Sequence, residues 1–399
     1  MVVSKNNNLR TSLTSEECNM QKKILGQKEL HKEVKEAGFC TGCGACVNLC
    51  PYHASYHDEV VMLHTCDLQE GGCYAFCPRT PTDLVELQKL LFDPRDLTPE
   101  IGSMKGFYIT RAADPRTRAG AQHGGTVTTL MALALQEGII DTAILADEGR
   151  SLLPEGTAVG DPAEVRKRGK SRFVVSPNVA ELNRLAKDGE KKIGIVATPC
   201  QALALAKMRQ KPLAPYADRI DRVKLVVGLF CGWALSWRQL LALLRKKTDL
   251  GEIEGMDIPP SKYHLLQVFT KKGRLEISLD EVTRCVRGAC WYCPDLTAEF
   301  SDLSVGSARL AEGWDEARNW NQVIVRTPLG QKLLDLARER GLLEFREVPA
   351  GNVEKLKNAS LGKKKTAVKN LVLRSRNPED LIYLDPRDPV LSTLIKHPA

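Results

Sequence analysis

The sequence lacks the features that would place it in a membrane or outside the cell. Its longest apolar run, residues 225–237, is too short to span a bilayer and is flanked by Lys224 and Arg238. No apolar signal-like segment follows the polar start, and 13 cysteines in 399 residues do not make the dense disulfide framework of a small secreted domain. We therefore expect no membrane span and a reducing, cytoplasmic compartment.

Two further absences narrow the class of function. The basic residues are not interleaved with aromatic residues, which make up 6% of the chain, so nucleic acid is not expected as a partner. No Gly-x-Gly-x-x-Gly fingerprint follows a strand, which argues against a Rossmann site for NAD but leaves open another kind of nicotinamide site. The net charge of +8 fits either ordinary solubility or attraction of an acidic partner, such as ferredoxin or a polyanionic coenzyme.

Residues 40–51 carry four cysteines with the spacing C-x2-C-x2-C-x3-C-P. Bacterial-type ferredoxins hold cubane iron–sulfur clusters with this spacing. Gly42, Gly44 and Ala45 would let the backbone pass close to the inorganic sulfides. A zinc knuckle also uses paired cysteines, but usually as two separated pairs, so a zinc-stabilised binding protein is the rival interpretation. The motif indicates a redox protein.

A second copy of the motif, in residues 66–78, is incomplete but ends in the same C-x3-C-P pattern. In two-fold ferredoxin repeats the last cysteine of each half binds the cluster of the other half. The predicted ligands of the first cluster are Cys40, Cys43, Cys46 and Cys77. The predicted ligands of the second cluster are Cys50, Cys66 and Cys73, which is one thiolate short.

The sequence offers several candidates for the missing ligand. Gln69 and Glu70 lie roughly where the absent cysteine would fall. Because carboxylates can bind iron, Glu70 or Asp67 would complete the site. Cys18 is a remote candidate, and an incomplete cluster is the remaining alternative.

The rest of the chain alternates strands and helices, which predicts an α/β unit with a mostly parallel sheet. The predicted strands are residues 107–112, 139–146, 173–176, 192–197, 223–230 and 322–326, with a hairpin of residues 263–270 and 274–279. The predicted helices are residues 84–91, 127–135, 179–187, 202–208, 236–246 and 329–340, and residues 351–376 form a lysine-rich helical tail. In such folds a ligand binds at the carboxyl ends of the strands.

Two stretches of the α/β unit are candidates for binding phosphate. Gly124 and Gly125 precede a helix, whose N-terminal N–H groups and dipole attract anions, although glycines are also common helix caps. Five basic residues lie between residues 166 and 172. They would form either a solvated loop or a clamp for the phosphates of a coenzyme.

A second set of cysteines lies in the α/β unit. Cys290 and Cys293 form a C-x2-C pair, and Cys200 and Cys231 each follow a predicted strand. A parallel sheet could bring these strand ends to the same edge, where the four thiols would close a third cluster site. Alternatively, Cys200 and Cys231 are buried apolar thiols.

Several motifs together resemble the beta subunits of coenzyme F420-reducing hydrogenases and formate dehydrogenases, a family that also includes 7-hydroxymethyl chlorophyll a reductase. The matching stretches are residues 124–130, 197–201, 229–231, 290–293, 299–306 and 323–327, and the N-terminal repeat matches members that carry one. The resemblance covers residues 38–375. The chain departs from the family pattern in the missing cysteine and in His123, which precedes the glycine pair.

The resemblance implies a non-Rossmann α/β domain that holds FAD and exchanges a hydride with coenzyme F420, without a side chain acting as covalent nucleophile. It also implies a cluster held by Cys200, Cys231, Cys290 and Cys293, and thus two or three 4Fe-4S clusters in all. The expected FAD contacts are Gly124, Gly125, Thr126, Thr128, Lys170, Ser171, Thr198 and Pro199.

The expected partner is another redox subunit of a hetero-oligomeric complex, such as a hydrogenase, a formate dehydrogenase or a heterodisulfide reductase-like enzyme, or a soluble ferredoxin. The alternatives are a ferredoxin-dependent reductase of the 7-hydroxymethyl chlorophyll a reductase type and a pure electron-transfer adaptor. The predicted organisation is an N-terminal arm (1–36), a ferredoxin-like domain (37–82), a helix and linker (83–106), an α/β FAD-binding domain (107–250), a C-terminal α/β part (251–350) and a basic tail (351–399).

Overall fold

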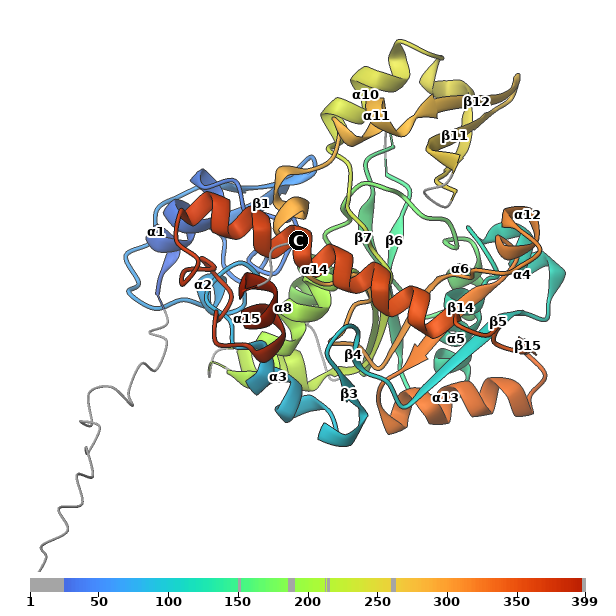
Figure 1. The fold of residues 1–399 in the computed structure, drawn as a ribbon, viewed down its shortest axis with the longest axis horizontal. Coiled ribbons are helices and arrows are strands. Elements are labelled where there is room, and N and C mark those ends of the chain that lie inside the picture. Colours follow the sequence, from blue (N-terminus) through green and yellow to red (C-terminus); the bar gives the residue numbers. More distant parts are fainter. Residues whose placement is uncertain are drawn as a thin grey trace, which may run out of the picture.

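An eight-stranded sheet forms the centre of the computed structural model, which describes residues 25–149, 152–185, 191–211, 213, 216–259 and 263–396 (Figure 1). Its strand order is β15-β5-β14-β13-β9-β8-β6-β7. The strands are β5 (Gly106–Ala112), β6 (Thr142–Asp147), β7 (Glu155–Val159), β8 (Ile193–Ala197), β9 (Val223–Leu229), β13 (Leu303–Ser307), β14 (Asn321–Val325) and β15 (Leu343–Arg346).

The sheet is mixed, so the prediction of a mostly parallel sheet is wrong. Only β6, β8, β9 and β13 pair in parallel, and the four pairings on the two flanks are antiparallel. The predicted strand at residues 173–176 is also wrong, because this segment makes only an isolated bridge between Val174 and Leu235. The other predicted strands are present, with ends shifted by up to three residues.

The central strands are buried on both faces, which explains their continuous apolar sequences. Ile195 and Ala197 of β8 pack into one apolar core together with α7 (Asn178–Leu185) and α8 (Pro199–Gln210). Val196 points to a second core, which is formed with α5 (Thr126–Gln136) and α13 (Pro328–Glu339). The sheet is therefore covered by helices on each side.

Helix α8 begins three residues earlier than the sequence predicts. Thr198 and Gln201 form a capping box, and Pro199 occupies the first helical position. A proline is favourable there because its missing N–H would have no partner inside the helix. Cys200 consequently lies in the first turn of α8, directly after strand β8.

A smaller lobe carries a three-stranded antiparallel sheet with helices α10 (Trp237–Arg245) and α11 (Leu279–Thr283), at the top of Figure 1. Its strands are β10 (Ile253–Asp257), β11 (Leu265–Thr270) and β12 (Gly273–Ser278), which confirm the predicted hairpin. The lobe has its own apolar core, to which Leu240, Leu244 and Val268 contribute.

The cysteine-rich N-terminal part has little regular structure. It contains α1 (Gln27–Leu30), a π-helix at His31–Glu36, the hairpin β1 (His53–Tyr56) and β2 (Glu59–Met62), and α2 (Gly72–Ala75); α3 (Leu84–Leu91) follows. The predicted helical tail is α14 (Asn352–Ser375), which crosses one face of the molecule and ends at this part (Figure 1). Together with α15 (Pro389–Lys396), α14 packs on the N-terminal part in a shared apolar core.

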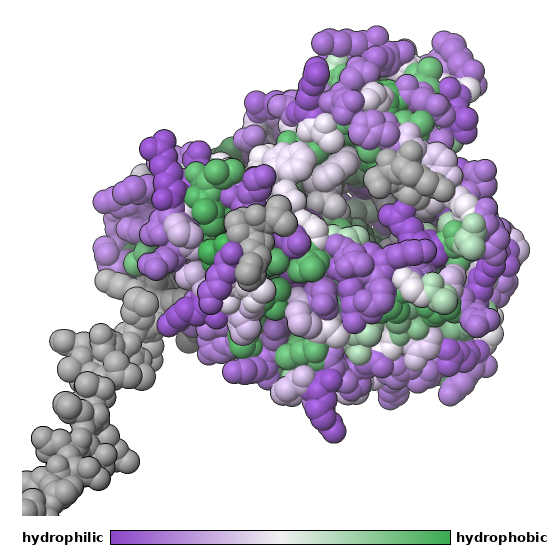
Figure 2. Space-filling model, viewed as in Figure 1, coloured by the Kyte–Doolittle hydropathy of each residue, from purple (hydrophilic) through white to green (hydrophobic). Residues whose placement is uncertain are grey.

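None of the helices in the described ranges has the length and apolar character needed to cross a bilayer. Figure 2 shows a mainly hydrophilic face on which apolar residues form small separate patches. One patch covers the end of α14 that adjoins the N-terminal part, where Leu373 is 67% exposed.

Candidate metal centres and cofactor site

The first group of cysteines surrounds a cavity of about 340 Å³ in the N-terminal part. All four predicted ligands of the first cluster line this cavity: Cys40, Cys43, Cys46 and Cys77. Gly42 and Gly44 have φ values of 71° and 85°. A Cβ at Gly42 would lie 2.8 Å from the Asp58 carbonyl oxygen, and one at Gly44 would lie 2.8 Å from the Ala180 nitrogen. The motif glycines are therefore required by packing around the cavity.

The surroundings of these thiols disfavour the deprotonated thiolate form when no metal is bound. Burial raises the pKa of Cys43 and of Cys46 well above the usual value, and neighbouring thiols raise both further. Burial also raises the pKa of Cys77 to about 11, although Lys207 acts in the opposite direction. Iron binding would compensate the buried thiolates, since metal coordination replaces their protons. The donor set and the cavity fit an iron–sulfur cluster.

Lys207 is a buried amine that stabilises the chain after Cys77. Its Nζ donates to the Cys77 carbonyl oxygen at 2.8 Å and to Thr80 Oγ1 at 2.7 Å. Lys207 lies on α8, two turns after Cys200. Helix α8 thus connects the first group of cysteines to the third.

The second group contains the thiols of Cys50, Cys66 and Cys73. Burial raises the pKa of Cys73 to about 12, and the nearby thiols of Cys50 and Cys66 contribute to this rise. The predicted alternatives Asp67, Gln69 and Glu70 are all exposed. Cys18 lies outside the described residues.

The third group brings together the four thiols of the α/β unit. Cys200 lies in the first turn of α8 and Cys231 follows β9. Cys290 lies within a 3-10 helix at Gly288–Tyr292, and Cys293 comes directly after it. Burial raises the pKa of Cys231, and the thiols of Cys290, Cys200 and Cys293 raise it further. The four thiols therefore share one buried site at the carboxyl ends of the parallel strands, and their role as cluster ligands stays a prediction.

Two cations lie beside the third group, of which Arg79 is buried and Lys363 is partly buried. Lys363 Nζ donates to the carbonyl oxygens of Cys231 at 2.6 Å and Asp295 at 2.7 Å. Arg79, directly after the Cys77-Pro78 pair, donates to the Ala289 carbonyl oxygen at 3.3 Å and to the Tyr383 hydroxyl. Although burial would raise the pKa of Cys293, Lys363 and Arg79 outweigh it, so that this pKa is lowered. Cys293 is therefore prepared to bind as a thiolate.

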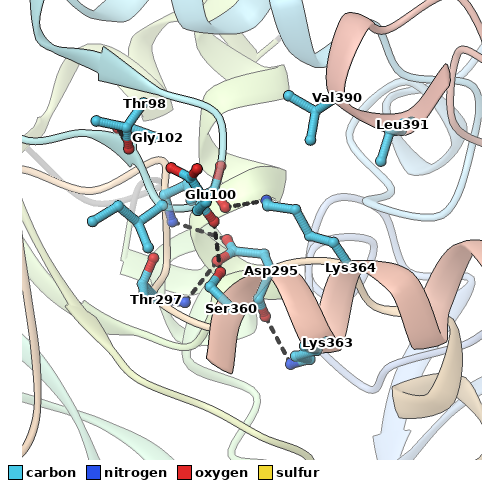
Figure 3. Close-up of polar contacts among 12 residues, drawn as sticks. Thr98, Glu100, Gly102, Asp295, Thr297, Ser360, Lys363, Lys364, Val390 and Leu391 are labelled. Carbon is cyan, nitrogen blue, oxygen red and sulfur yellow. Dashed lines mark hydrogen bonds and ion pairs between the residues drawn. The ribbon is translucent and has the colours of Figure 1, made fainter. Parts of the chain in front are cut away.

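A buried polar cluster fixes the segment that follows Cys293 (Figure 3). Asp295 accepts hydrogen bonds from the N–H groups of Thr297 and Glu299, each at 2.9 Å. Lys364 forms a buried ion pair with Glu299, whose pKa burial raises to about 7. Lys363 and Lys364 thus reach from α14 to the same segment and hold the cysteine loop in place.

The first group of thiols adjoins each of the other two. Cys200 of the third group and Cys77 both raise the pKa of Cys43, after burial. Cys77 similarly contributes to the pKa of Cys73 in the second group. Electrons passed between such sites would follow the order second, first, third.

Sulfur positions in these groups are not those of a single-ion site. No set of three His, Cys, Asp or Glu side chains among the described residues is arranged to hold one metal ion. A cubane differs from such a site because its four ligands bind different iron atoms.

A separate cavity of about 290 Å³ lies between the smaller lobe and the carboxyl end of β6. Lys170 and Ser171, two of the predicted FAD contacts, line it, as do Gln122, Arg172 and Arg318. Gln122 fixes one wall, because its Nε2 donates to the Met256 carbonyl oxygen at 3.0 Å and to Asp257 Oδ1 at 2.9 Å. Its lining supplies both amide and cationic groups for an anionic coenzyme.

The other predicted FAD contacts do not line this cavity. Thr126 is buried; its N–H donates to Asn321 Oδ1 at 3.2 Å and its hydroxyl pairs with Thr110 at 2.8 Å. A Cβ at Gly124 would lie 2.8 Å from the same Asn321 oxygen. Gly125 and Thr128 belong to this turn, whereas Thr198 and Pro199 lie next to Cys200. The glycine turn packs α5 against β14, and the role of these residues as FAD contacts stays a prediction.

The basic run at residues 166–172 is partly neutralised by ion pairs. Arg168 contacts Asp147 at 2.7 Å and Glu164 at 2.9 Å, and Arg172 contacts Glu148 at 3.3 Å. Lys170 instead donates to the Glu254 carbonyl oxygen at 3.2 Å, at the cavity. Of the five basic residues in this run, Lys170 and Arg172 are the ones that line the cavity.

Sequence reasoning missed the cations Arg79, Lys207 and Lys363 as neighbours of the thiols. Arg79 had one available signal, its position two residues after Cys77. Lys207 and Lys363 occur among ordinary helical residues, where nothing in their spacing distinguishes them from solvent-facing lysines.

Most of the chain matches domains of known protein families. Residues 34–56 match a 4Fe-4S binding domain. Residues 107–183 match the N-terminal domain, and residues 190–350 the C-terminal domain, of the coenzyme F420 hydrogenase/dehydrogenase beta subunit. These matches confirm a ferredoxin-like region followed by an α/β domain.

Individual relatives agree with this assignment. The chain is 31% identical over 283 residues to the coenzyme F420 hydrogenase subunit beta of Methanothermobacter thermautotrophicus, covering 69% of this chain and 96% of that protein. It is 28% identical to the coenzyme F420 hydrogenase subunit beta of Methanosarcina barkeri, covering 61% and 83%. A chain of the F420-reducing [NiFe] hydrogenase complex from Methanosarcina barkeri shares the fold, with a TM-score of 0.62 at 24% identity over 69% of this chain and 95% of that one.

Proposed function

Because the chain belongs to the coenzyme F420 hydrogenase/dehydrogenase beta subunit family, we propose that it uses FAD to exchange a hydride with coenzyme F420. In the same proposal, single electrons pass through iron–sulfur clusters to or from a partner redox subunit. The partner would be a hydrogenase, a formate dehydrogenase or a heterodisulfide reductase-like enzyme.

The observation that carries the proposal is the continuity of the three groups of thiols. Eleven cysteines form these groups, and Cys200 of the third group packs against the apolar core that contains Cys43 of the first. A storage or structural role would not require such adjacency. One-electron transfer requires it, because each cluster must pass its electron to a neighbour.

The cavity beside β6 supplies what an anionic coenzyme needs. Lys170, Arg172 and Arg318 provide positive charge, and Ser171 and Gln122 provide polar groups. FAD, when bound, supplies two-electron exchange with a hydride partner and one-electron exchange with clusters. The protein side chains would bind and orient the coenzymes, and we assign none of them as a nucleophile.

The cysteine site nearest the flavin would be the third group. Both this group and the cavity lie at the carboxyl ends of parallel strands, the third group after β8 and β9 and the cavity after β6. Ligands of open α/β sheets gather at this edge. The arrangement supports a path from the cavity through the third group to the ferredoxin-like region.

The proposal is tested with the full chain purified without oxygen. We expect about one FAD per chain and reduction of the clusters by reduced F420 in the absence of any partner. Protein with full iron and sulfide content but no flavin would contradict the proposal. FAD binding without any reaction with F420 would instead support a pure electron-transfer adaptor, and reaction with a different organic acceptor would support a reductase of the 7-hydroxymethyl chlorophyll a reductase type.

A further inference from the structure

A buried carboxylate contacts two of the side chains that line the proposed coenzyme cavity. Asp257 ends strand β10 in the smaller lobe and is 1% exposed. Its Oδ1 accepts a hydrogen bond from Gln122 Nε2 at 2.9 Å and lies 3.6 Å from His123 Nε2. Its Oδ2 lies 3.4 Å from Arg318 Nη2. One carboxylate therefore gathers three segments that are distant in the sequence.

Gln122 and Arg318 are the two partners at the cavity. Gln122 Oε1 accepts a hydrogen bond from the Ser171 N–H at 3.3 Å, so the carboxylate also helps to fix the segment at Ser171. The Arg318 guanidinium lies over the ring of Phe269, 5.7 Å from its centroid. Arg318 is thus held by a ring and by a carboxylate, while its side chain is still 32% exposed.

The ion pair leaves the guanidinium available to a ligand. Asp257 Oδ2 receives no hydrogen bond from the residues that the structure describes, so it attracts Arg318 by charge alone. The N–H groups of Arg318 are therefore not used up by Asp257. Arg172, which also lines the cavity, instead pairs with Glu148, whose side chain is 61% exposed.

Stability alone does not explain a carboxylate in this position. A buried carboxylate loses its hydration, and the attraction of a partner charge often only offsets that cost. A carboxylate that fixes a cation at a cavity has a use in binding, because a guanidinium held in one orientation matches the oxygens of a phosphate group.

We infer that Asp257 is a positioning residue, which holds Arg318 so that its guanidinium binds the diphosphate group of FAD. The inference rests on the proposed function and adds to it the part of the coenzyme that this wall of the cavity binds. Lys170, which lines the same cavity, supplies a second positive charge for that group.

The test is binding of ADP, which carries the diphosphate of FAD without the flavin, to the full chain after removal of any bound flavin. Asp257→Asn keeps an acceptor for Gln122 but removes one negative charge near the cavity. Charge alone would tighten ADP binding, whereas loss of positioning weakens it. We expect the affinity for ADP to fall about threefold to tenfold, and that for adenosine, which lacks the diphosphate, to stay the same. Isothermal titration calorimetry measures both.

A double-mutant cycle shows whether Asp257 acts through Arg318. We expect Arg318→Gln to weaken ADP binding about tenfold, and the double variant to bind no more weakly than Arg318→Gln alone. Arg318→Lys keeps the charge but not the fork of N–H groups, so it should also weaken binding. Asp280→Asn is the matched control, because its carboxylate is 77% exposed and pairs with His264 in the same lobe. It makes the same change in net charge and should leave the affinity unchanged.

Several results would overturn the inference. These are unchanged or tighter ADP binding in Asp257→Asn, equal weakening of ADP and adenosine, additive losses in the double variant, or full affinity in Arg318→Lys. The iron content and thermal unfolding of each variant report whether it is folded. Natural protein that binds no ADP would refute the inference even where FAD content and reduction by F420 support the proposed function. Protein with the expected ADP results but no reaction with F420 would contradict only the proposed function.

Discussion

At the scale of single residues, buried cations surround the thiols that are proposed to bind iron. Lys207 lies beside Cys77, and Arg79 and Lys363 lie beside Cys293. A positive charge held near a cluster favours the state with one more electron, because burial weakens the screening of the attraction. The cations would therefore raise the reduction potentials of the clusters proposed beside them.

Replacement of Lys363 tests this effect. Lys363→Gln keeps a donor for the carbonyl oxygens of Cys231 and Asp295 but removes the charge. We expect the potential of the third cluster to fall by roughly 50–100 mV, from a Coulomb interaction of about 2 kcal/mol. Lys365→Gln, on the exposed side of the same helix, is the control and should shift it far less. Equal shifts in a redox titration would show that the effect is not local.

Lys170 offers a second test at this scale. Its amine is at the cavity, whereas Lys167 pairs with Glu164 at 2.5 Å on the surface. We expect Lys170→Met to weaken binding of an anionic coenzyme, FAD or F420, about threefold to tenfold, and Lys167→Met to leave it unchanged. Fluorescence titration of each coenzyme checks both. Unchanged affinity in Lys170→Met would remove this lysine from the proposed site.

The residues of the site differ in how well the sequence predicts them. The spacing of the cysteines in the sequence predicts which of them share a site, because thiols three residues apart on a tight loop lie close together. Cys200 and Cys231 were predictable from their positions after two strands, because parallel strand ends share an edge. Arg79 and Lys363 were not, since burial of a cation depends on contacts with distant segments such as residues 289–295.

At the scale of elements, the N-terminal part depends on what fills its cavity. The strands β1 and β2 and the helix α2 have four residues each, which is too few for independent stability. The cavity beside Cys40 and Cys43 would be empty without a cluster. Iron is therefore expected to stabilise this part far more than the main sheet.

Removal of iron with a chelator and a reductant tests this expectation. Hydrogen exchange should become fast in residues 38–82, while β8 and β9 at the centre of the sheet remain protected, because the sheet does not contain the cavity. The untreated protein, measured in parallel, is the control. A uniform loss of protection across both parts would contradict the prediction.

Two of the strands missed by sequence reasoning, β7 and β15, share a physical cause. Strands β7 and β15 lie at the edges of the sheet, where one-sided burial leaves few apolar residues. Residues 173–176 are apolar like a strand, but Phe173 has a φ of 57°, which interrupts an extended chain. Buried central strands such as β8 and β9 were predicted well because both of their faces are apolar.

At the scale of the whole molecule, the third group of thiols would join the proposed coenzyme cavity to the ferredoxin-like region. Arg287 strengthens this junction through a buried ion pair with Asp58 and a hydrogen bond to the Cys40 carbonyl oxygen at 3.2 Å. The cysteine loop at residues 285–293 is thereby fixed to the first group. A mixed sheet can place the cavity and the third group at one edge as well as a parallel sheet can. Only the carboxyl ends of β6, β8 and β9 are needed for that edge.

Loss of one thiol of the third group should interrupt electron transfer between the proposed coenzyme cavity and the first cluster. We expect Cys200→Ser to reduce the rate at which reduced F420 supplies electrons to the first cluster at least about tenfold, while dithionite still reduces that cluster. Rapid mixing followed by EPR measures both. Cys285→Ser, a buried thiol outside the three groups, is the matched control and should behave like the natural protein. An unchanged rate in Cys200→Ser would require another route.

Helix α8 has a consequence for how this chain can change during evolution. Cys200 and Lys207 are seven residues apart on one rigid helix, so about 10 Å of helix separates the third group from the carbonyl of Cys77. Inserting or deleting one residue between them would rotate one end by about 100° relative to the other. Lys207 would then lose its hydrogen bond to the Cys77 carbonyl oxygen, or Cys200 would point away from the other three thiols of the third group. The length of this helix between the two positions is therefore fixed by the two sites at its ends.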